Sequence, residues 1–366
     1  MTKITQISQM DKTGKNIFCP IDLHQRKMLA GIAVDRSGPV FHEFDTEWDG
    51  GVVKLINLLR ALKKSHGGAE VWVAYEASGS GFLLADLLLE EGFKTAVLAP
   101  TKLPITPKSR SQKTDKKDVI RILEVMRGHV LAGNELPEVW IPSPQLRDHR
   151  EVVRCRLDLK EELADIKNAI HGLLRRNGVK KPAGLKTNWT KKHVLWLHSI
   201  VDTLGDGVGT HLKSLLRRLS FYEDECNQLE QEVLVLAESE TYRDQVKALT
   251  SIPGVGVLTA MVFLVELGDL NRFPNRRALG NYLGLVPRSW ESGEDQDRKG
   301  RISKQGPPRV RKVLNQAAWA LVRWDDWWKE WFEERAGKGK KKRKKKMVVA
   351  VMRRLGIMMW HQALAA

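Results

Sequence analysis

Cysteine and long apolar stretches are both scarce in this sequence. Its 366 residues include three cysteines, Cys19, Cys155 and Cys226, which lie far apart along the chain. That spacing argues against a disulfide framework and against a cysteine-based zinc site. No apolar run reaches the roughly 20 residues that a membrane-spanning helix needs. The opening residues lack the apolar core of a signal peptide. We therefore expect a cytoplasmic protein that does not enter a membrane.

Basic residues outnumber acidic residues in this chain. The chain holds 61 Lys and Arg against 44 Asp and Glu, for a formal net charge of +17. Such a balance indicates a polyanionic partner, and nucleic acid is the default interpretation, with a membrane surface as the competing one. Nine Lys and Arg fall within residues 335–346. We predict that this run contacts nucleic-acid backbone; the alternative is a solvated loop.

The first part of the chain alternates between short strands and helices. Residues 16–45 have the composition of three short strands, 50–64 have helical spacing, and 70–76 and 94–100 are further strands. A helix between the last two ends near Gly92. This alternation predicts a mixed α/β layer.

Long helices are expected next, because apolar residues recur at alternating spacings of three and four. The clearest series is Leu212, Leu215, Leu219, Tyr222, Cys226, Leu229, Val233 and Leu236. This is the pattern of a coiled-coil seam. It fits an intramolecular helical hairpin and a dimerisation arm equally well.

The last part of the chain begins near residue 246. The SIPGVG segment at 251–256 resembles a helix–hairpin–helix loop, whose glycines would let the backbone approach a phosphate. An ordinary packing corner is the alternative. A tryptophan-rich helix follows the charged stretch 292–307, and we expect its indoles to be core residues more often than base-stacking platforms. They are Trp319, Trp324, Trp327, Trp328 and Trp331.

Four acidic residues occupy positions where a metal site could be built. Asp22 and Glu76 each end a predicted strand, while Asp115 and Asp118, three residues apart, share one face of a predicted helix. Carboxylates are the ligands that Mg²⁺ and Mn²⁺ prefer, and no His or Cys cluster competes nearby. Each acid alone would more often be a cap, a salt-bridge partner or a residue that favours a helix N-terminus. Their order along the chain resembles the RNase H/RuvC nuclease core.

Together with GLVPRSWESG at 284–293 and GRISKQG at 300–306, these acids carry a wider resemblance. The chain resembles, over nearly its whole length, the insertion-sequence family numbered one hundred and ten, the DEDD transposases related to the Piv and MooV invertases. The resemblance implies a RuvC-like catalytic domain at 1–144, a coiled-coil linker and dimerisation region at 145–245, and a mainly α transposase domain at 246–366. The last would contain the helix–hairpin–helix element, the serine and the basic segment.

The resemblance also implies roles for individual residues. The family's four acids fall on Asp22, Glu76, Asp115 and Asp118, and its nucleophilic serine falls on Ser292. Residue chemistry alone would not select Ser292, because Ser289 and Ser303 are comparable and no histidine lies near it in sequence. Three basic residues are candidates for steadying phosphate charge. They are Arg288, Arg301 and Lys304.

The expected activity is therefore RNA-guided DNA recombination for an insertion sequence, through a phosphoserine intermediate. The resemblance implies Mg²⁺ or Mn²⁺ as cofactor, a non-coding bridge RNA that pairs with target and donor DNA, and dimers that assemble into a tetramer. The protein is expected to act in the bacterial cytoplasm, at the nucleoid. The main alternative is a RuvC-like metal-dependent nuclease or Holliday-junction resolvase that uses the same acids and water. A nucleic-acid-binding protein with purely structural acids is the third interpretation.

Overall fold

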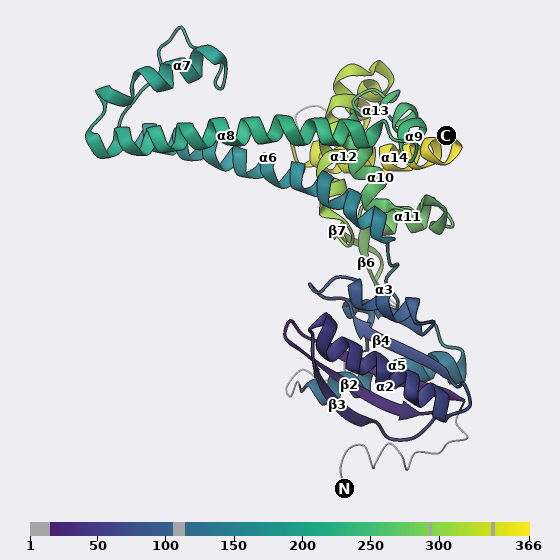
Figure 1. Cartoon of the computed structure of the whole chain (residues 1–366). Coiled ribbons are helices and arrows are strands. Elements are labelled where there is room, and N and C mark those ends of the chain that lie inside the picture. Colours follow the sequence, from purple (N-terminus) through teal and green to yellow (C-terminus); the bar gives the residue numbers. More distant parts are fainter. Residues whose placement is uncertain (1–14, 105–113, 293–294, 338–340) are drawn as a thin grey trace. The chain divides into compact units, whose positions relative to one another are not determined.

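The chain folds into two compact units, Met1–Ile141 and Pro142–Ala366 (Figure 1). The structure is a computed structural model that describes residues 15–104, 114–292, 295–337 and 341–366, without side chains at 289–299, 341 and 342. The expected division into 1–144, 145–245 and 246–366 is finer than these two units and stays a prediction.

A five-stranded mixed sheet is the centre of the first unit, and its order is β3-β2-β1-β4-β5. The first three strands form an antiparallel meander, whereas β4 runs parallel to both β1 and β5. The strands are β1 (Asn16–Leu23), β2 (Lys27–Val34), β3 (Val40–Asp45), β4 (Glu70–Glu76) and β5 (Lys94–Leu98). The predicted mixed α/β layer is confirmed, with the strands in the expected segments.

Helices cover both faces of this sheet because apolar side chains alternate along β1. Ile17, Cys19 and Ile21 are buried with residues of α2 and α3 on one face. Phe18 is buried on the other face with Ile122 and other residues of α5. The helices are α2 (Val53–Ser65), α3 (Leu83–Glu90) and α5 (Asp115–Ala132). The short π-helix η1 (Trp48–Val52) precedes α2, and the 3₁₀ turn η2 (Pro100–Lys102) follows β5.

A long helical hairpin opens the second unit. Its arms are α6 (Pro144–Arg176) and α8 (Asp206–Ala237), joined through α7 (Lys191–Ser199) and the short turn η3 (Val201–Thr203). The Ser143 hydroxyl begins α6 by accepting a hydrogen bond from the Leu146 N–H at 3.2 Å. At a rise of about 1.5 Å per residue, the 33 residues of α6 span roughly 50 Å.

The apolar seam of α8 packs within the chain. Leu212, Leu215 and Leu219 are buried in a cluster that includes Ile166 and Ile170 of α6. Of the two interpretations that the spacing left open, the structure contains the intramolecular hairpin. The expected coiled-coil dimerisation stays a prediction.

In the described part of the second unit, six further helices and a β-hairpin follow this long hairpin. The helices are α9 (Arg243–Thr250), α10 (Val257–Leu267), α11 (Arg276–Tyr282), α12 (Pro308–Trp324), α13 (Asp326–Ala336) and α14 (Lys341–Ala365), with the 3₁₀ turn η4 (Leu270–Arg272) after α10. The hairpin strands are β6 (Pro287–Ser292) and β7 (Asp295–Ile302). The expected mainly α character of this region is confirmed, although sequence reasoning did not predict the hairpin.

The central helix of this unit, α10, is buried along its last eight residues. Its one buried charge, Glu266, is paired with α6: the Arg154 guanidinium donates two hydrogen bonds to the carboxylate, at 2.7 and 2.9 Å. Arg150 of α6 donates to the carbonyls of Val265 and Glu266 at the end of α10. The two arginines therefore join the hairpin to the helical core, and their charge is favourable at a helix C-terminus.

The SIPGVG segment forms the turn between α9 and α10. Gly254 has φ +85°, and a Cβ there would lie 2.9 Å from the Ala317 carbonyl oxygen and 2.9 Å from the Leu321 nitrogen of α12. The close approach that this glycine allows is therefore to a neighbouring helix, as the packing-corner interpretation has it. The predicted helix–hairpin–helix phosphate site is not confirmed.

The tryptophan-rich segment forms two helices. Asp325 ends α12 and caps α13, because its side chain accepts a hydrogen bond from the Trp328 N–H at 3.0 Å. Trp328 is 9% exposed, whereas Trp319, Trp324 and Trp327 are 41%, 75% and 58% exposed, so the indoles are only partly core residues. The basic run is also not a plain loop, because α14 begins within it at Lys341.

The cysteines match the expectation from their spacing, since all three are free. Cys19 and Cys226 are buried, and Cys155 is exposed on α6. Burial raises the pKa of the Cys19 thiol to about 12, which keeps it protonated and unreactive. Among the described residues, no helix combines the length and the apolarity needed to cross a membrane.

Candidate functional site

Two of the predicted metal ligands lie side by side because β1 and β4 are parallel neighbours. Ile21 pairs with Tyr75, so Asp22 and Glu76 are the next residue on each strand. Both side chains therefore leave the sheet at the same edge, near the carboxyl ends of the strands. This is where polar sites of α/β proteins are commonly built.

The other two acids arrive at this edge on α5, which packs over β1, β2 and β4. Thr114 is in extended conformation before the helix, and Asp115 and Asp118 occupy its first turn. Asp118 is 8% exposed and Asp115 is exposed. A glycine in β2 permits this close packing: a Cβ on Gly31 would lie 2.6 Å from the Cγ1 of Val119.

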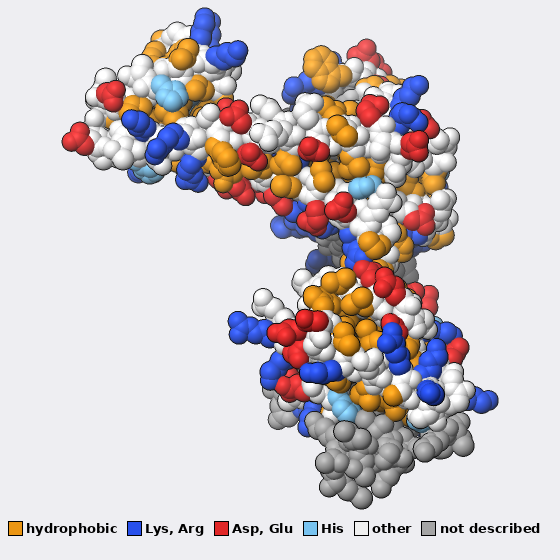
Figure 2. All heavy atoms as spheres, viewed as in Figure 1, with side chains coloured by type: hydrophobic (Ala, Val, Ile, Leu, Met, Phe, Trp, Pro, Cys, Tyr) orange, Lys and Arg blue, Asp and Glu red, His pale blue; other side chains and the backbone are white. Residues whose placement is uncertain are grey.

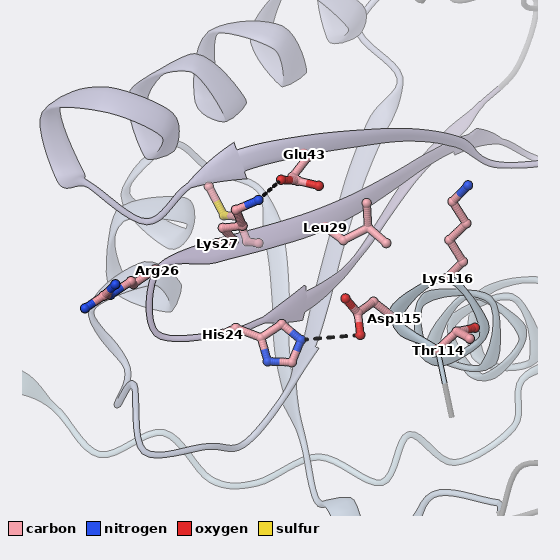
Figure 3. Close-up of a pocket in the computed structure, with 9 residues that line it drawn as sticks. His24, Arg26, Lys27, Leu29, Glu43, Thr114, Asp115 and Lys116 are labelled. Carbon is pink, nitrogen blue, oxygen red and sulfur yellow. Dashed lines mark hydrogen bonds and ion pairs between the residues drawn. The ribbon is translucent and has the colours of Figure 1, made fainter. Parts of the chain in front are cut away.

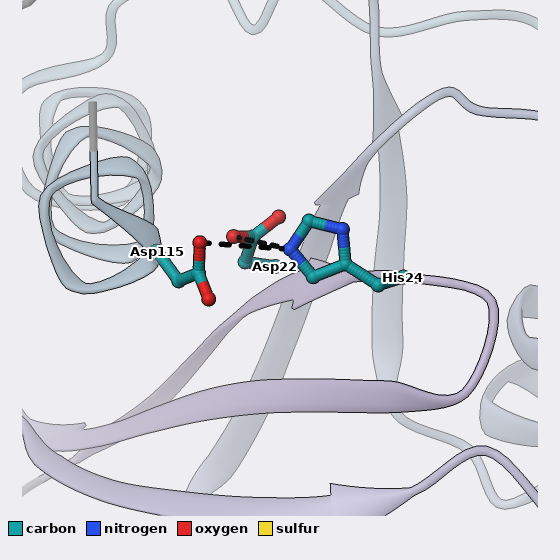
Figure 4. Close-up of side chains that lie close together, drawn as sticks. All are labelled: Asp22, His24 and Asp115. Atoms are coloured by element: carbon teal, nitrogen blue, oxygen red, sulfur yellow. Dashed lines mark hydrogen bonds and ion pairs between the residues drawn. The ribbon is translucent and has the colours of Figure 1, made fainter.

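Asp22, Asp115 and His24 form a compact cluster (Figure 4). One ligand atom from each residue can be chosen so that all three lie within 4.8 Å of one another. The His24 Nε2 atom lies 3.2 Å from Asp22 Oδ2 and 3.7 Å from Asp115 Oδ1. Carboxylate oxygens with an imidazole nitrogen suit a divalent cation, and the spacing of these atoms fits one.

The electrostatics of this edge favour a bound cation. Burial raises the pKa of the Asp22 carboxyl above its usual value; His24 partly offsets this, and the negative charges of Asp115 and Asp118 add to it. Carboxylates that are close enough to raise the pKa of a neighbour are stabilised by any cation placed between them.

An arginine of the same helix already supplies some positive charge. The Arg121 guanidinium is hydrogen-bonded to Glu76, and its Nη2 lies 3.3 Å from Asp118 Oδ1. Arg121 thus bridges two of the four predicted ligands, one on β4 and one on α5. Its Nε is buried and has no hydrogen-bond partner among the described residues.

A pocket of about 570 Å³ opens beside the cluster, and His24 and Asp115 form part of its wall (Figure 3). Arg26, Lys27 and Lys116 also line it, and Lys27 is paired with Glu43 at 2.5 Å. Basic side chains next to an acidic cluster provide contacts for a phosphodiester while the acids hold a cation.

Ser292 lies in the other compact unit, as the last residue of β6, where it pairs with Asp295 of β7. Its side chain is outside the described part of the structure, so the geometry joins the four acids to one another but does not extend to the serine. Hydrogen bonds hold the base of the β6–β7 hairpin. Arg311 donates to the carbonyls of Leu283 and Gly306 at 3.2 and 2.9 Å, and Lys304 donates its N–H to the Gly284 carbonyl at 3.1 Å.

The three basic residues predicted to act near Ser292 differ in their contacts and exposure. Arg288 donates to the Ser303 carbonyl at 3.3 Å, so part of its guanidinium is used within the hairpin base. Arg301 and Lys304 are exposed. Lys304 has φ +56°, which is uncommon for a residue other than glycine.

Sequence reasoning did not single out His24 or Arg121 as part of the acidic edge. Both had a local signal. His24 follows Asp22 by two residues, so the end of β1 supplies both side chains, and Arg121 follows Asp118 by three residues on one helical face. The contact between Arg121 and Glu76 depends on tertiary packing and has no local signal.

Comparison with known proteins identifies a family of transposases. A family model described as "Transposase", of the DEDD IS110 type, matches residues 19–177, and a model described as "Transposase IS116/IS110/IS902 family" matches residues 246–333. The first match contains all four acids, and the second contains Ser292.

Named relatives cover most of the chain. The protein y4qE of Sinorhizobium fredii is 29% identical over 307 residues, which are 83% of this chain and 72% of that one. The transposase for insertion sequence element IS1533 of Leptospira borgpetersenii is 24% identical over 307 residues, 83% and 85% of the two chains. The pilin gene-inverting protein of Moraxella bovis is 28% identical over 137 residues, 37% and 42%. With both family models matched in order along the chain, and with relatives of the same family over most of its length, the chain belongs to the IS110 family of transposases.

Proposed function

We propose that this protein cuts and rejoins DNA strands with a divalent cation held by Asp22, Glu76, Asp115 and Asp118, and with Ser292 as nucleophile. The observation that supports it most is the gathering of Asp22, His24 and Asp115 ligand atoms within 4.8 Å at the edge of the sheet. Membership of a transposase family makes DNA the substrate.

The four acids fit a hard divalent cation such as Mg²⁺ or Mn²⁺, because their ligand atoms are carboxylate oxygens. When bound, such a cation neutralises charge on the phosphate and on the attacking and leaving oxygens. His24 and Arg121 orient the carboxylates around it: His24 contacts Asp22 and Asp115, and Arg121 contacts Glu76 and Asp118.

The side chains of the pocket would hold the DNA backbone. Arg26 and Lys116 line it beside Asp115, where they can neutralise phosphates that flank the scissile bond. Arg301 and Lys304, in the serine-bearing unit, are candidates for the same task near the nucleophile.

In the proposed reaction, the Ser292 Oγ attacks the scissile phosphorus. A bond forms between Oγ and phosphorus, the bond from phosphorus to the 3′ oxygen breaks, and the hydroxyl proton of the serine is lost as the 3′ oxygen gains one. A 3′ hydroxyl then attacks the phosphoserine of the partner strand and releases the serine. Bond energy is conserved in both steps, so no ATP is needed.

We further propose that a non-coding bridge RNA selects the target and donor DNA by base pairing, which leaves the protein to recognise backbone and shape. Dimers that pair into a tetramer would let the acids of one copy act with the serine of another. The resemblance to the family motivates both proposals, and the +17 net charge agrees with the first.

The test uses the purified full chain, its element's flanking RNA, end-labelled DNA and Mg²⁺. We expect a protein–DNA adduct that survives denaturant. The adduct should be lost with Ser292→Ala and with Asp115→Ala, whereas Ser289→Ala is the matched serine control and should retain it.

Cleaved DNA without an adduct, unchanged by Ser292→Ala, would instead identify a hydrolytic RuvC-like nuclease or junction resolvase. Activity that persists in Asp115→Ala would show that the acids are structural. Omitting the RNA tests guidance separately: recombination at the same sites without it would overturn that part of the proposal.

A further inference from the structure

The far end of the helical hairpin is rich in positive charge, of which Lys167 is paired with Glu223 of α8. Residues 166–201 include eight Lys and Arg and no Asp or Glu, and they form the end of α6, the connecting segment and α7. Figure 2 shows Lys and Arg side chains gathered over this end of the hairpin. Residues 178–245 lie outside both matched family segments, so the family comparison assigns no role to most of this region.

A pocket of about 670 Å³ lies within this basic end, and no acidic residue lines it. Its polar wall includes Arg175, Lys180 and Lys181. Lys181 is held in place because its Nζ donates to the Asn188 Oδ1 at 2.6 Å and to the Lys186 carbonyl at 3.2 Å. The pocket therefore presents one positioned cation, Lys181, beside Arg175 and Lys180, which a solvated charge run would not do.

Aromatic side chains also line this pocket. His171, His193 and Trp196 line the pocket, and the His193 and Trp196 rings lie 5.5 Å apart. Trp189 packs edge-on against both histidines, at 4.9 and 5.3 Å. The backbone at Trp189 has φ +64°, a strained conformation for a large side chain that costs on the order of 1–3 kcal/mol and commonly occurs at binding sites.

Hydrogen bonding and burial determine the tautomer and charge of His193. The backbone N–H of Trp189 donates to the Nδ1 of His193 at 3.1 Å, so Nδ1 is an acceptor and the ring proton lies on Nε2. Burial lowers the pKa of His193, and the charges of His171 and Lys181 lower it further. The His193 ring is therefore neutral at neutral pH, and with 1% of the residue exposed it packs behind the more accessible rings of His171, Trp189 and Trp196.

We propose that this pocket binds one unpaired nucleotide of a single-stranded nucleic acid, with its base against the aromatic side chains and its phosphates on Arg175, Lys180 and Lys181. A base in a duplex is stacked on both faces and cannot enter such a pocket without being flipped out. An acidic peptide would satisfy the cations but would make no use of the aromatic side chains. The inference does not rest on the metal centre or on Ser292.

The test is photo-crosslinking of the full chain with 12-nucleotide strands that carry 5-iodouracil, one of DNA and one of RNA, followed by peptide mapping. We expect crosslinks within residues 187–213, which contain Trp189, His193 and Trp196. Lys180→Ala with Lys181→Ala should reduce this yield by about ten-fold, because two phosphate contacts are lost. The relative yields of the two strands show whether DNA or RNA is the preferred source.

The matched control is Lys191→Ala with Lys192→Ala, which removes the same charge from the same end but from residues that do not line the pocket. Its yield should stay within about two-fold of the wild-type yield. An equal loss in both double variants would reveal a diffuse charge patch and overturn the proposal. So would the absence of crosslinks in 187–213 when crosslinks form elsewhere.

Two competitors test the role of the base. An unmodified single strand should suppress the crosslink, whereas an abasic strand or a duplex of the same length should do so at least about ten-fold less well, since base stacking contributes roughly 1–3 kcal/mol. Equal competition by the abasic strand or by polyglutamate would show that charge alone is recognised. Trp196→Phe should retain binding and Trp196→Leu should lose it; equal behaviour would exclude stacking on this residue.

Discussion

At the scale of single residues, Arg121 has the most unusual position. One guanidinium contacts both Glu76 and Asp118, which are proposed ligands of the same cation. A fixed positive charge at this place orients the two carboxylates and also repels a divalent cation. Orientation favours catalysis, whereas repulsion weakens binding of the cation in the absence of DNA.

Replacing Arg121 should separate these two effects. In Arg121→Gln, Mn²⁺ should bind the DNA-free protein about five-fold more tightly, because roughly 1 kcal/mol of Coulomb repulsion is removed. Electron paramagnetic resonance of free Mn²⁺ measures this. Lys64→Gln removes the same charge from α2 on the other face of the sheet and should have no effect. Unchanged or weaker binding in Arg121→Gln would show that the guanidinium does not compete with the cation.

At the scale of secondary-structure elements, the contact between β2 and α5 determines where two of the acids lie. Gly31→Ala should force α5 outward, because the new Cβ would lie 2.6 Å from Val119 Cγ1 and a β-branched side chain in a helix has little rotamer freedom. We expect a loss of about 1–3 kcal/mol in stability and a lower rate of adduct formation.

The compensating variant makes this prediction specific. Val119→Ala removes the clashing atom, so Gly31→Ala with Val119→Ala should recover part of the adduct rate lost in Gly31→Ala alone. Additive losses in the double variant, measured as a double-mutant cycle, would mean that the two residues do not act through this contact.

Sequence reasoning was most successful where the pattern of apolar residues is strong. The alternation in NIFCPIDL and EVWVAYE predicted β1 and β4, and the positions of Asp22 and Glu76 at their ends predicted a shared sheet edge. The β6–β7 hairpin was not predicted, because PRSWES and DQDRKGRI are polar and carry no period-two apolar signal. The break between α12 and α13 depends on one capping residue, Asp325, within an otherwise helical pattern. Contacts such as Arg121 with Glu76 join residues 45 positions apart and need the fold itself.

At the scale of the whole molecule, each compact unit has its own buried cores. The first unit is built on the two faces of the sheet, and the second on α10 with its neighbours and on the helical hairpin. No single cooperative transition is therefore expected, and damage in one unit should leave the other folded.

Glu266→Gln tests this independence. It removes the charge that Arg154 contacts in the core of the second unit, which should cost about 2 kcal/mol because hydrogen bonds to charged groups are strong. Hydrogen exchange should quicken in α6 and α10 and stay unchanged in β1 and β4. Glu151→Gln, at an exposed partner of the same arginine, should change stability by less than about 0.5 kcal/mol. Faster exchange in β1 and β4 as well would show that the two units unfold together.

The burial of two of the three cysteines has a practical consequence. Cys19 and Cys226 are enclosed by packed side chains, and of the three cysteines Cys155 alone is exposed, on α6. The unmodified chain thus offers a single site for a thiol-reactive spin label or fluorophore, on a rigid helix of the hairpin. Distances between such labels on separate copies can report how the proteins associate on nucleic acid, without any engineered residue.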